Sequence, residues 1–138
     1  MAFIPVNFEE GKLVQLPMYN GGSSATYTVG QALTTTSGYY ATATAGQNAD
    51  VEAICMEAGT ITTSGTLLKC ISTRGVRFLA DTAADPIATQ VCTYVDLSTA
   101  NLLDTTASTD DLFYLEKIVG ALANRKVQGF FQHGTPLA

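Results

Sequence analysis

Few of the residue types that serve as catalysts or metal ligands occur in this chain of 138 residues. The only histidine, His133, lies in a segment that reads as a short tail, whereas a triad base or a metal ligand needs a fixed position. The three cysteines, Cys55, Cys70 and Cys92, are far apart and have no histidine beside them, unlike the short spacings of zinc sites. We therefore expect no catalytic residue, no metal and no cofactor.

The acidic residues do not suggest an active site either. Glu9–Glu10 and Asp110–Asp111 are adjacent pairs, and neighbouring side chains on a strand point to opposite faces, so neither pair is suited to shared acid–base catalysis. Gly21–Gly22 lacks the lysine of a phosphate-binding loop. Asp81 and Asp85, with the Asp110–Asp111 pair, are the remaining polar cluster that an enzyme could use. We predict that the chain is not an enzyme.

Charge is scarce as well, since only 14% of the residues are charged and the formal net charge is -5. A nucleic-acid partner would require clustered basic residues, and the seven lysines and arginines are scattered. Lys117, Arg125 and Lys126 could form a small basic spot, although a solvated turn is favoured. A surface rich in Thr, Ala, Ser and Gly indicates contact with another protein instead.

Signals for export or membrane insertion are also missing. The opening residues, MAFIPVNFEEG, have no basic n-region, and the apolar runs are far shorter than the roughly 20 residues that cross a bilayer. Three cysteines inside apolar runs favour free buried thiols over a disulfide framework. We expect synthesis in a reducing cytoplasm and no membrane partner.

Short β-branched and aromatic runs separated by glycine-rich turns fill most of the chain. They predict a mainly β fold, a single small antiparallel β-barrel or sandwich-like domain over residues 11–138 with a short C-terminal tail. Residues 1–10 are predicted to form an extended N-terminal arm, which either packs along its own domain or adds to a neighbouring chain. The apolar residues of this arm are Phe3, Ile4, Pro5, Val6 and Phe8.

Local patterns place several strands. Residues 12–18 read as an edge strand containing Pro17. Residues 27–36 and 39–44 flank Ser37–Gly38 as a hairpin, with Tyr39 and Tyr40 pointing to opposite sides. Residues 51–57 form a further strand, residues 58–65 a loop, and residues 66–73 and 76–80 a second hairpin around Arg74–Gly75.

Residues 108–119 are ambiguous and decide the fold class. Leu112, Leu115, Val119 and Leu122 share one helical stripe, and a helix is one interpretation. The aromatic sequence Leu112-Phe113-Tyr114-Leu115 and the interruption at Gly120 favour a strand instead. We expect a strand hairpin that ends with residues 127–131.

The second half of the chain shows a further pattern. Its elements are Cys92–Leu97 (CTYVDL), Ala107–Asp111 (ASTDD), Leu112–Val119 and Val127–Phe131, preceded by Arg77–Asp81. In the first half, Gly30-Gln31-Ala32-Leu33 is followed by Gly38-Tyr39-Tyr40-Ala41. Together these runs resemble the small capsid decoration proteins of tailed bacteriophages.

The resemblance implies a virion structural protein that binds the outer capsid surface and cements neighbouring copies of the major capsid protein. It also implies a homotrimer, with the arm residues Phe3–Val6 and Phe8 as capsid contacts and with Tyr19, Tyr39 and Tyr40 as candidate interface aromatics. The alternative is a head-fibre, tail or adhesin module that binds a host surface through Tyr19, Tyr27, Tyr39 and Tyr40.

Overall fold

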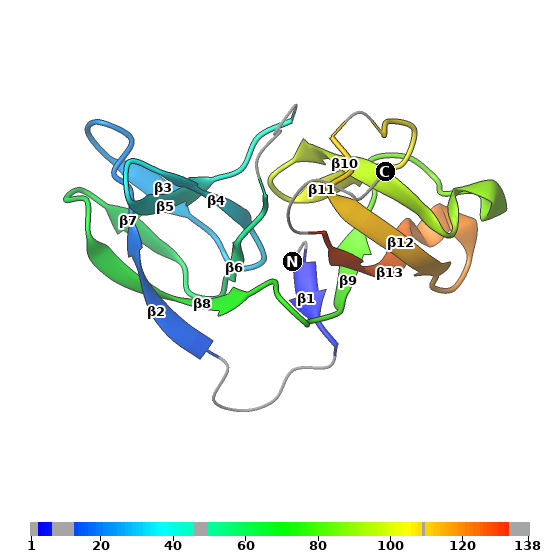
Figure 1. Cartoon of the computed structure of the whole chain (residues 1–138), viewed down its shortest axis with the longest axis horizontal. Helices are drawn as coiled ribbons and strands as arrows, with labels where there is room; N and C mark the ends of the chain where they lie inside the picture. Colours follow the sequence, from blue (N-terminus) through cyan, green and yellow to red (C-terminus); the bar gives the residue numbers. More distant parts are fainter. Residues whose placement is uncertain (1–2, 7–12, 46–49, 109, 133–138) are drawn as a thin grey trace.

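The computed structural model of the chain describes residues 3–6, 13–45, 50–108 and 110–132. These residues build a closed β-barrel and a six-stranded sheet, which lie side by side in Figure 1. The predicted mainly β fold of barrel or sandwich type is therefore confirmed. No helix in the described ranges is long and apolar enough to cross a membrane.

The barrel occupies the N-terminal half of the chain, on the left of Figure 1. Its strands, in spatial order, are β2 (Leu13–Met18), β5 (Tyr39–Thr42), β4 (Ala32–Thr36), β6 (Ala53–Cys55) and β8 (Thr66–Ser72). β2 pairs with β8 along its whole length and with β5 at Met18↔Tyr40. The expected edge strand therefore has a neighbour on each side, although a single residue pair joins it to β5. β3 (Ala25–Tyr27) and β7 (Gly59–Ile61) form a separate two-stranded sheet.

Of the two hairpins expected between residues 27 and 80, the first is present. Ser37 (φ 51°) and Gly38 (φ 84°) join β4 to β5, and positive φ at both central residues is typical of the type I′ turn of a two-residue hairpin. The second expected hairpin is wrong, because β8 belongs to the barrel and β9 (Phe78–Asp81) to the six-stranded sheet. Gly75, at φ 72°, lets the chain leave the barrel rather than fold back along it. The expected loop 58–65 also contains strand β7.

The six-stranded sheet has the order β1-β9-β13-β12-β10-β11, and all the neighbours that pair in it are antiparallel. Its other strands are β1 (Phe3–Pro5), β10 (Thr93–Thr99), β11 (Leu102–Asp104), β12 (Phe113–Ile118) and β13 (Lys126–Phe131). The strand interpretation of residues 112–119 is confirmed, since Phe113 and Leu115 are buried while Tyr114 between them is partly exposed. That alternation has the period of two residues that a half-buried strand requires.

The main core lies between the inner face of this sheet and the outside of the barrel. The rings of Phe3, Phe78 and Phe113 surround Phe131, with centroids 5.0, 5.6 and 5.0 Å from it. Barrel residues such as Ile71 join the same cluster from the other side. The sheet and the barrel therefore share one continuous core.

A second core fills the barrel itself. Its members are Met18, Tyr27, Leu33, Ala53, Cys55, Ile61, Leu68 and Cys70. Strand β6 is buried at every position because Ala53 and Cys55 face the barrel interior, while Ile54 between them faces the main core. Alternate side chains of one short strand thus serve both cores.

The N-terminal residues adopt the first of the two arrangements expected for them. β1 pairs with β9 through Phe3↔Ala80 and Pro5↔Phe78, and the Phe3 side chain is 0% exposed. These residues therefore pack along their own domain, and Phe3 is unavailable as a capsid contact in this conformation. Ile4 and Pro5 are partly buried, Val6 is 46% exposed, and Phe8 lies outside the described residues.

Candidate functional site

The outer face of the six-stranded sheet carries a row of three aromatic side chains, Tyr94, Tyr114 and Phe130, here called the aromatic row. The residues lie opposite one another on β10, β12 and β13. The centroids of the Tyr94 and Tyr114 rings are 5.1 Å apart, and those of Tyr114 and Phe130 are 5.2 Å apart. All three are partly exposed, because the alternate residues of their strands fill the core below.

Arg77 extends the row beyond Phe130. Its guanidinium carbon lies 5.9 Å from the centroid of the Phe130 ring, within the range of a cation–π contact. The Nε–H group of Arg77 also donates to the Glu116 carboxylate, at 2.9 and 3.1 Å from its two oxygens. Such a half-exposed ion pair contributes little stability, but it orients the guanidinium over the ring.

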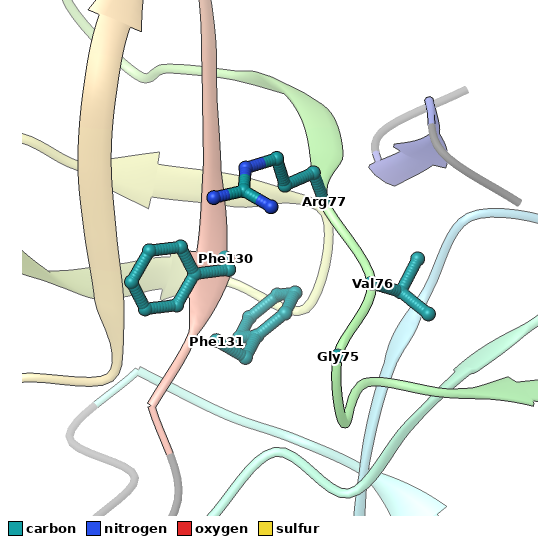
Figure 2. Close-up of a pocket in the computed structure, with 5 residues that line it drawn as sticks. All are labelled: Gly75, Val76, Arg77, Phe130 and Phe131. Carbon is teal, nitrogen blue, oxygen red and sulfur yellow. The ribbon is translucent and has the colours of Figure 1, made fainter.

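A pocket of about 230 Å³ opens at this end of the row. Figure 2 shows the guanidinium of Arg77 extended toward Phe130, and the Phe131 ring between β13 and the segment Gly75–Val76. These five residues line the pocket. Since cavities that hold small-molecule ligands range upward from about 300 Å³, this pocket suits a single side chain of a partner protein better than a cofactor.

Cys92 lies beside the aromatic row and is exposed, so the expectation of a buried thiol is wrong at this position. Cys92 directly precedes β10, and its backbone is left-handed, with φ 66°. This conformation turns Cys92 out of the line of the strand. A hydrogen bond to the Cys92 thiol raises the pKa of Tyr114. The expectation of free buried thiols is confirmed for Cys55 and Cys70.

The structure separates the tyrosines that the sequence singled out. Tyr19 and Tyr39 stack on the barrel, with centroids 6.3 Å apart and planes 22° from parallel. Tyr40 packs against the barrel interior, and Tyr27 is buried with its hydroxyl donating to the Tyr19 carbonyl oxygen at 2.6 Å. The sequence patterns did not identify the aromatic row, although Tyr94, Tyr114 and Phe130 are each followed by an apolar residue.

The aspartates of the predicted polar cluster have separate partners. Asp81 pairs with Lys126, and Asp85 accepts from the Arg125 Nε–H group at 2.8 Å. These two ion pairs also occupy two residues of the expected basic spot.

Asp110 lies elsewhere, in a hollow of about 450 Å³ shared with Asp96 and Asp104. One oxygen of Asp96 accepts the backbone N–H groups of Asp110 and Asp111, each at 2.9 Å. Asp96 thus holds the connection before β12, and this carboxylate serves the fold. Within the described residues no group of histidine, cysteine and acidic side chains could hold a metal ion.

The geometry therefore points to one surface, the aromatic row, which ends at the Arg77 guanidinium and a small pocket. Comparison of the chain with protein-family models, with curated protein sequences and with solved structures finds no match in any of the three.

Proposed function

We propose that this protein is a virion structural protein that decorates the outside of a tailed-phage capsid and binds the major capsid protein through the aromatic row. The observation that carries the proposal is the position of the row. The segments that resemble decoration proteins, CTYVDL, the strand after ASTDD, and the closing strand, each contribute one of its rings. The segments that carry the resemblance thus build the candidate contact face.

The composition of this face suits a protein partner. Tyrosine, phenylalanine and arginine are enriched at the centres of protein interfaces, where their large side chains bury much area. Tyr94, Tyr114 and Phe130 are held in place by their strands and by contacts between their rings. Binding would therefore cost little further side-chain entropy. The pocket beside Arg77 would receive one protruding side chain of the capsid.

Cementing then follows from the geometry of a lattice. A protein that binds only where neighbouring capsid subunits are assembled favours the assembled state by mass action. A homotrimer at a local symmetry point would engage three such faces together, and this multivalency would turn a modest single contact into stable attachment. The low charge of the chain fits a surface that is covered in the particle.

The test is to mix the purified protein with undecorated, expanded capsids and to image the particles. Added density on the outer surface, with the six-stranded sheet facing the shell, is the expected result. Capsids that stay bare at high protein concentration would contradict the proposal. Density in which the aromatic row faces solvent would reject this contact face while leaving decoration itself intact.

A second function is favoured by the stacked pair Tyr19–Tyr39 on the barrel. Partly exposed aromatic rings also bind the apolar faces of sugars, which suits a head-fibre, tail or adhesin module that recognises a host surface. A glycan array probed with the purified protein separates the two functions. Specific glycan binding that is lost in Tyr39→Ala would support the adhesin function.

A further inference from the structure

Two of the three cysteines lie face to face inside the barrel. Cys55 on β6 and Cys70 on β8 are directly opposite in the antiparallel register, and both side chains are 0% exposed. Both belong to the barrel core, together with Tyr27 and Leu68. They are free thiols in this structure.

The register gives this pair the geometry of a disulfide. The N–H group of Met56 donates to the Lys69 carbonyl oxygen at 2.9 Å, and that of Cys55 donates away from β8, to Gln31. Cys55 and Cys70 therefore occupy a non-hydrogen-bonded pair, where opposite Cα atoms are about 4.5 Å apart. Disulfides span Cα separations of about 4.4–6.8 Å, so the bond needs little movement of the backbone.

The two thiols also differ in reactivity. A hydrogen bond with the Cys70 side chain lowers the pKa of Cys55. The pKa of Cys70 is raised, mainly by the same hydrogen bond and secondly by burial of the thiol. Since the thiolate is the nucleophile, the first attack is assigned to Cys55, and the same disulfide results whichever sulfur attacks first.

We propose that Cys55 and Cys70 form a reversible disulfide that locks the barrel when the protein meets an oxidant such as a peroxide. The Cys55 thiolate attacks one peroxide oxygen, the O–O bond breaks, and the departing hydroxide takes a proton and leaves as water. The Cys70 sulfur then attacks the sulfur of the Cys55 sulfenic acid, the S–O bond breaks, and the hydroxyl leaves as water with the Cys70 proton. The two electrons lost by the thiols reduce the peroxide, and a dithiol reductant reverses the change.

An oxidant would reach the buried pair through local opening of the barrel between β2 and β5. β2 lies beside Cys70 in the register Val14↔Cys70, where Val14 is 43% exposed, and it joins β5 only at Met18↔Tyr40. Local opening of so short a pairing requires much less free energy than global unfolding. A small oxidant such as hydrogen peroxide would reach Cys55 in this way without loss of the fold.

The test uses the whole chain treated with hydrogen peroxide, then denatured and alkylated with a maleimide. The reduced protein carries three cysteines and takes three labels. After oxidation we expect the Cys92→Ser variant to fall from two labels to none, and to return to two after treatment with dithiothreitol. The melting temperature of the oxidised variant should rise by roughly 5–10 °C, because the disulfide closes a short loop in the unfolded chain.

Cys92→Ser is the decisive variant because it leaves the barrel core unchanged, and peptide mapping identifies the bond. A peptide that links residues 55 and 70 supports the proposal. Two labels retained after oxidation, or conversion of either cysteine to a sulfinic acid without a cross-link, would overturn it. Cys70→Ser, if folded, should form no intramolecular cross-link under the same treatment.

Discussion

The rings of Phe3 and Phe131 meet edge to face with centroids 5.0 Å apart, although the two residues lie near opposite ends of the sequence. β1 and β13 both pair with β9, and this arrangement brings the two rings together. The N-terminal strand is therefore a member of the main core, and changes there should first affect stability.

Phe3→Ala should lower the free energy of unfolding by about 3–5 kcal/mol, because it removes a fully buried ring from the aromatic cluster. Val6→Ala is the matched control and should change it by less than about 0.5 kcal/mol, since Val6 is 46% exposed. Chemical denaturation measures both. Unchanged stability in Phe3→Ala, combined with loss of capsid binding, would restore the arm as the contact surface.

Gly129 admits no larger residue. A Cβ atom at this position would lie 1.9 Å from the Tyr114 carbonyl oxygen and 2.7 Å from the Phe113 ring. Gly129→Ala should therefore destabilise the fold by about 3 kcal/mol or prevent folding, because a backbone atom cannot move aside as a flexible side chain can. Gln128→Ala, one residue away and partly exposed, should be nearly neutral in the same thermal melts.

Asp96 is 5% exposed and holds the backbone N–H groups of Asp110 and Asp111. Asp96→Ala should cost about 2–3 kcal/mol, because two donors lose a charged acceptor. Asp104→Ala should cost less than about 1 kcal/mol, since Asp104 accepts only local hydrogen bonds from Thr106 at an exposed turn. Equal losses in the two variants would show that the buried carboxylate has no special role.

Stability should fall at alkaline pH because burial, and secondarily the nearby Cys55, raise the pKa of Tyr27. In the unfolded chain the Tyr27 hydroxyl ionises near pH 10, before it does so in the folded protein. The contribution of neutral Tyr27 to stability is therefore complete below about pH 10, and it is lost as the pH rises toward the pKa of Tyr27 in the folded protein. Within that window the loss approaches about 1.4 kcal/mol per pH unit. Tyr27→Phe should be less stable at neutral pH but should lack this component of the alkaline loss, as measured by denaturation across the pH range.

Tyr114→Ala should weaken capsid binding at least tenfold while the protein stays folded, because Tyr114 is the central ring of the aromatic row. Tyr114→Phe keeps the ring and loses only the hydroxyl, so its binding should match that of the unmodified protein. Tyr39→Ala, on the barrel, should also bind normally. Sedimentation of capsids with labelled variants measures all three, and equal binding by every variant would exclude the row as the contact.

Local sequence patterns predicted the elements whose partners are close in sequence. The turn at Ser37–Gly38 indicates the β4–β5 hairpin by itself. The aromatic residues Phe113 and Tyr114 and the interruption at Gly120 favoured a strand over a helix for β12. The same logic failed at Gly75, because a glycine permits positive φ without deciding whether the chain turns back or crosses to another sheet. β9 lies between β1 and β13, and neither strand is its neighbour in the sequence.

The candidate site was harder to predict for a related reason. Tyr94, Tyr114 and Phe130 become a row only when three strands adopt one particular register, which includes an irregularity between Leu115 and Lys117. Adjacent tyrosines such as Tyr39 and Tyr40 are easily recognised as a pair in a sequence. These three residues are widely separated, so no local pattern groups them. Burial of Phe3 likewise depends on Phe131, which no local pattern identifies as its partner.

The position of β13 between β9 and β12 also sets the order in which the chain can fold during synthesis. Every barrel strand, up to Ser72, leaves the ribosome before β13 is made, so the barrel can close first. Until β13 is in place, the sheet that buries Ile54 and Ile71 on the outside of the barrel is incomplete. β13 then closes the main core, and a nascent chain stalled before Lys126 would expose this apolar surface to chaperones.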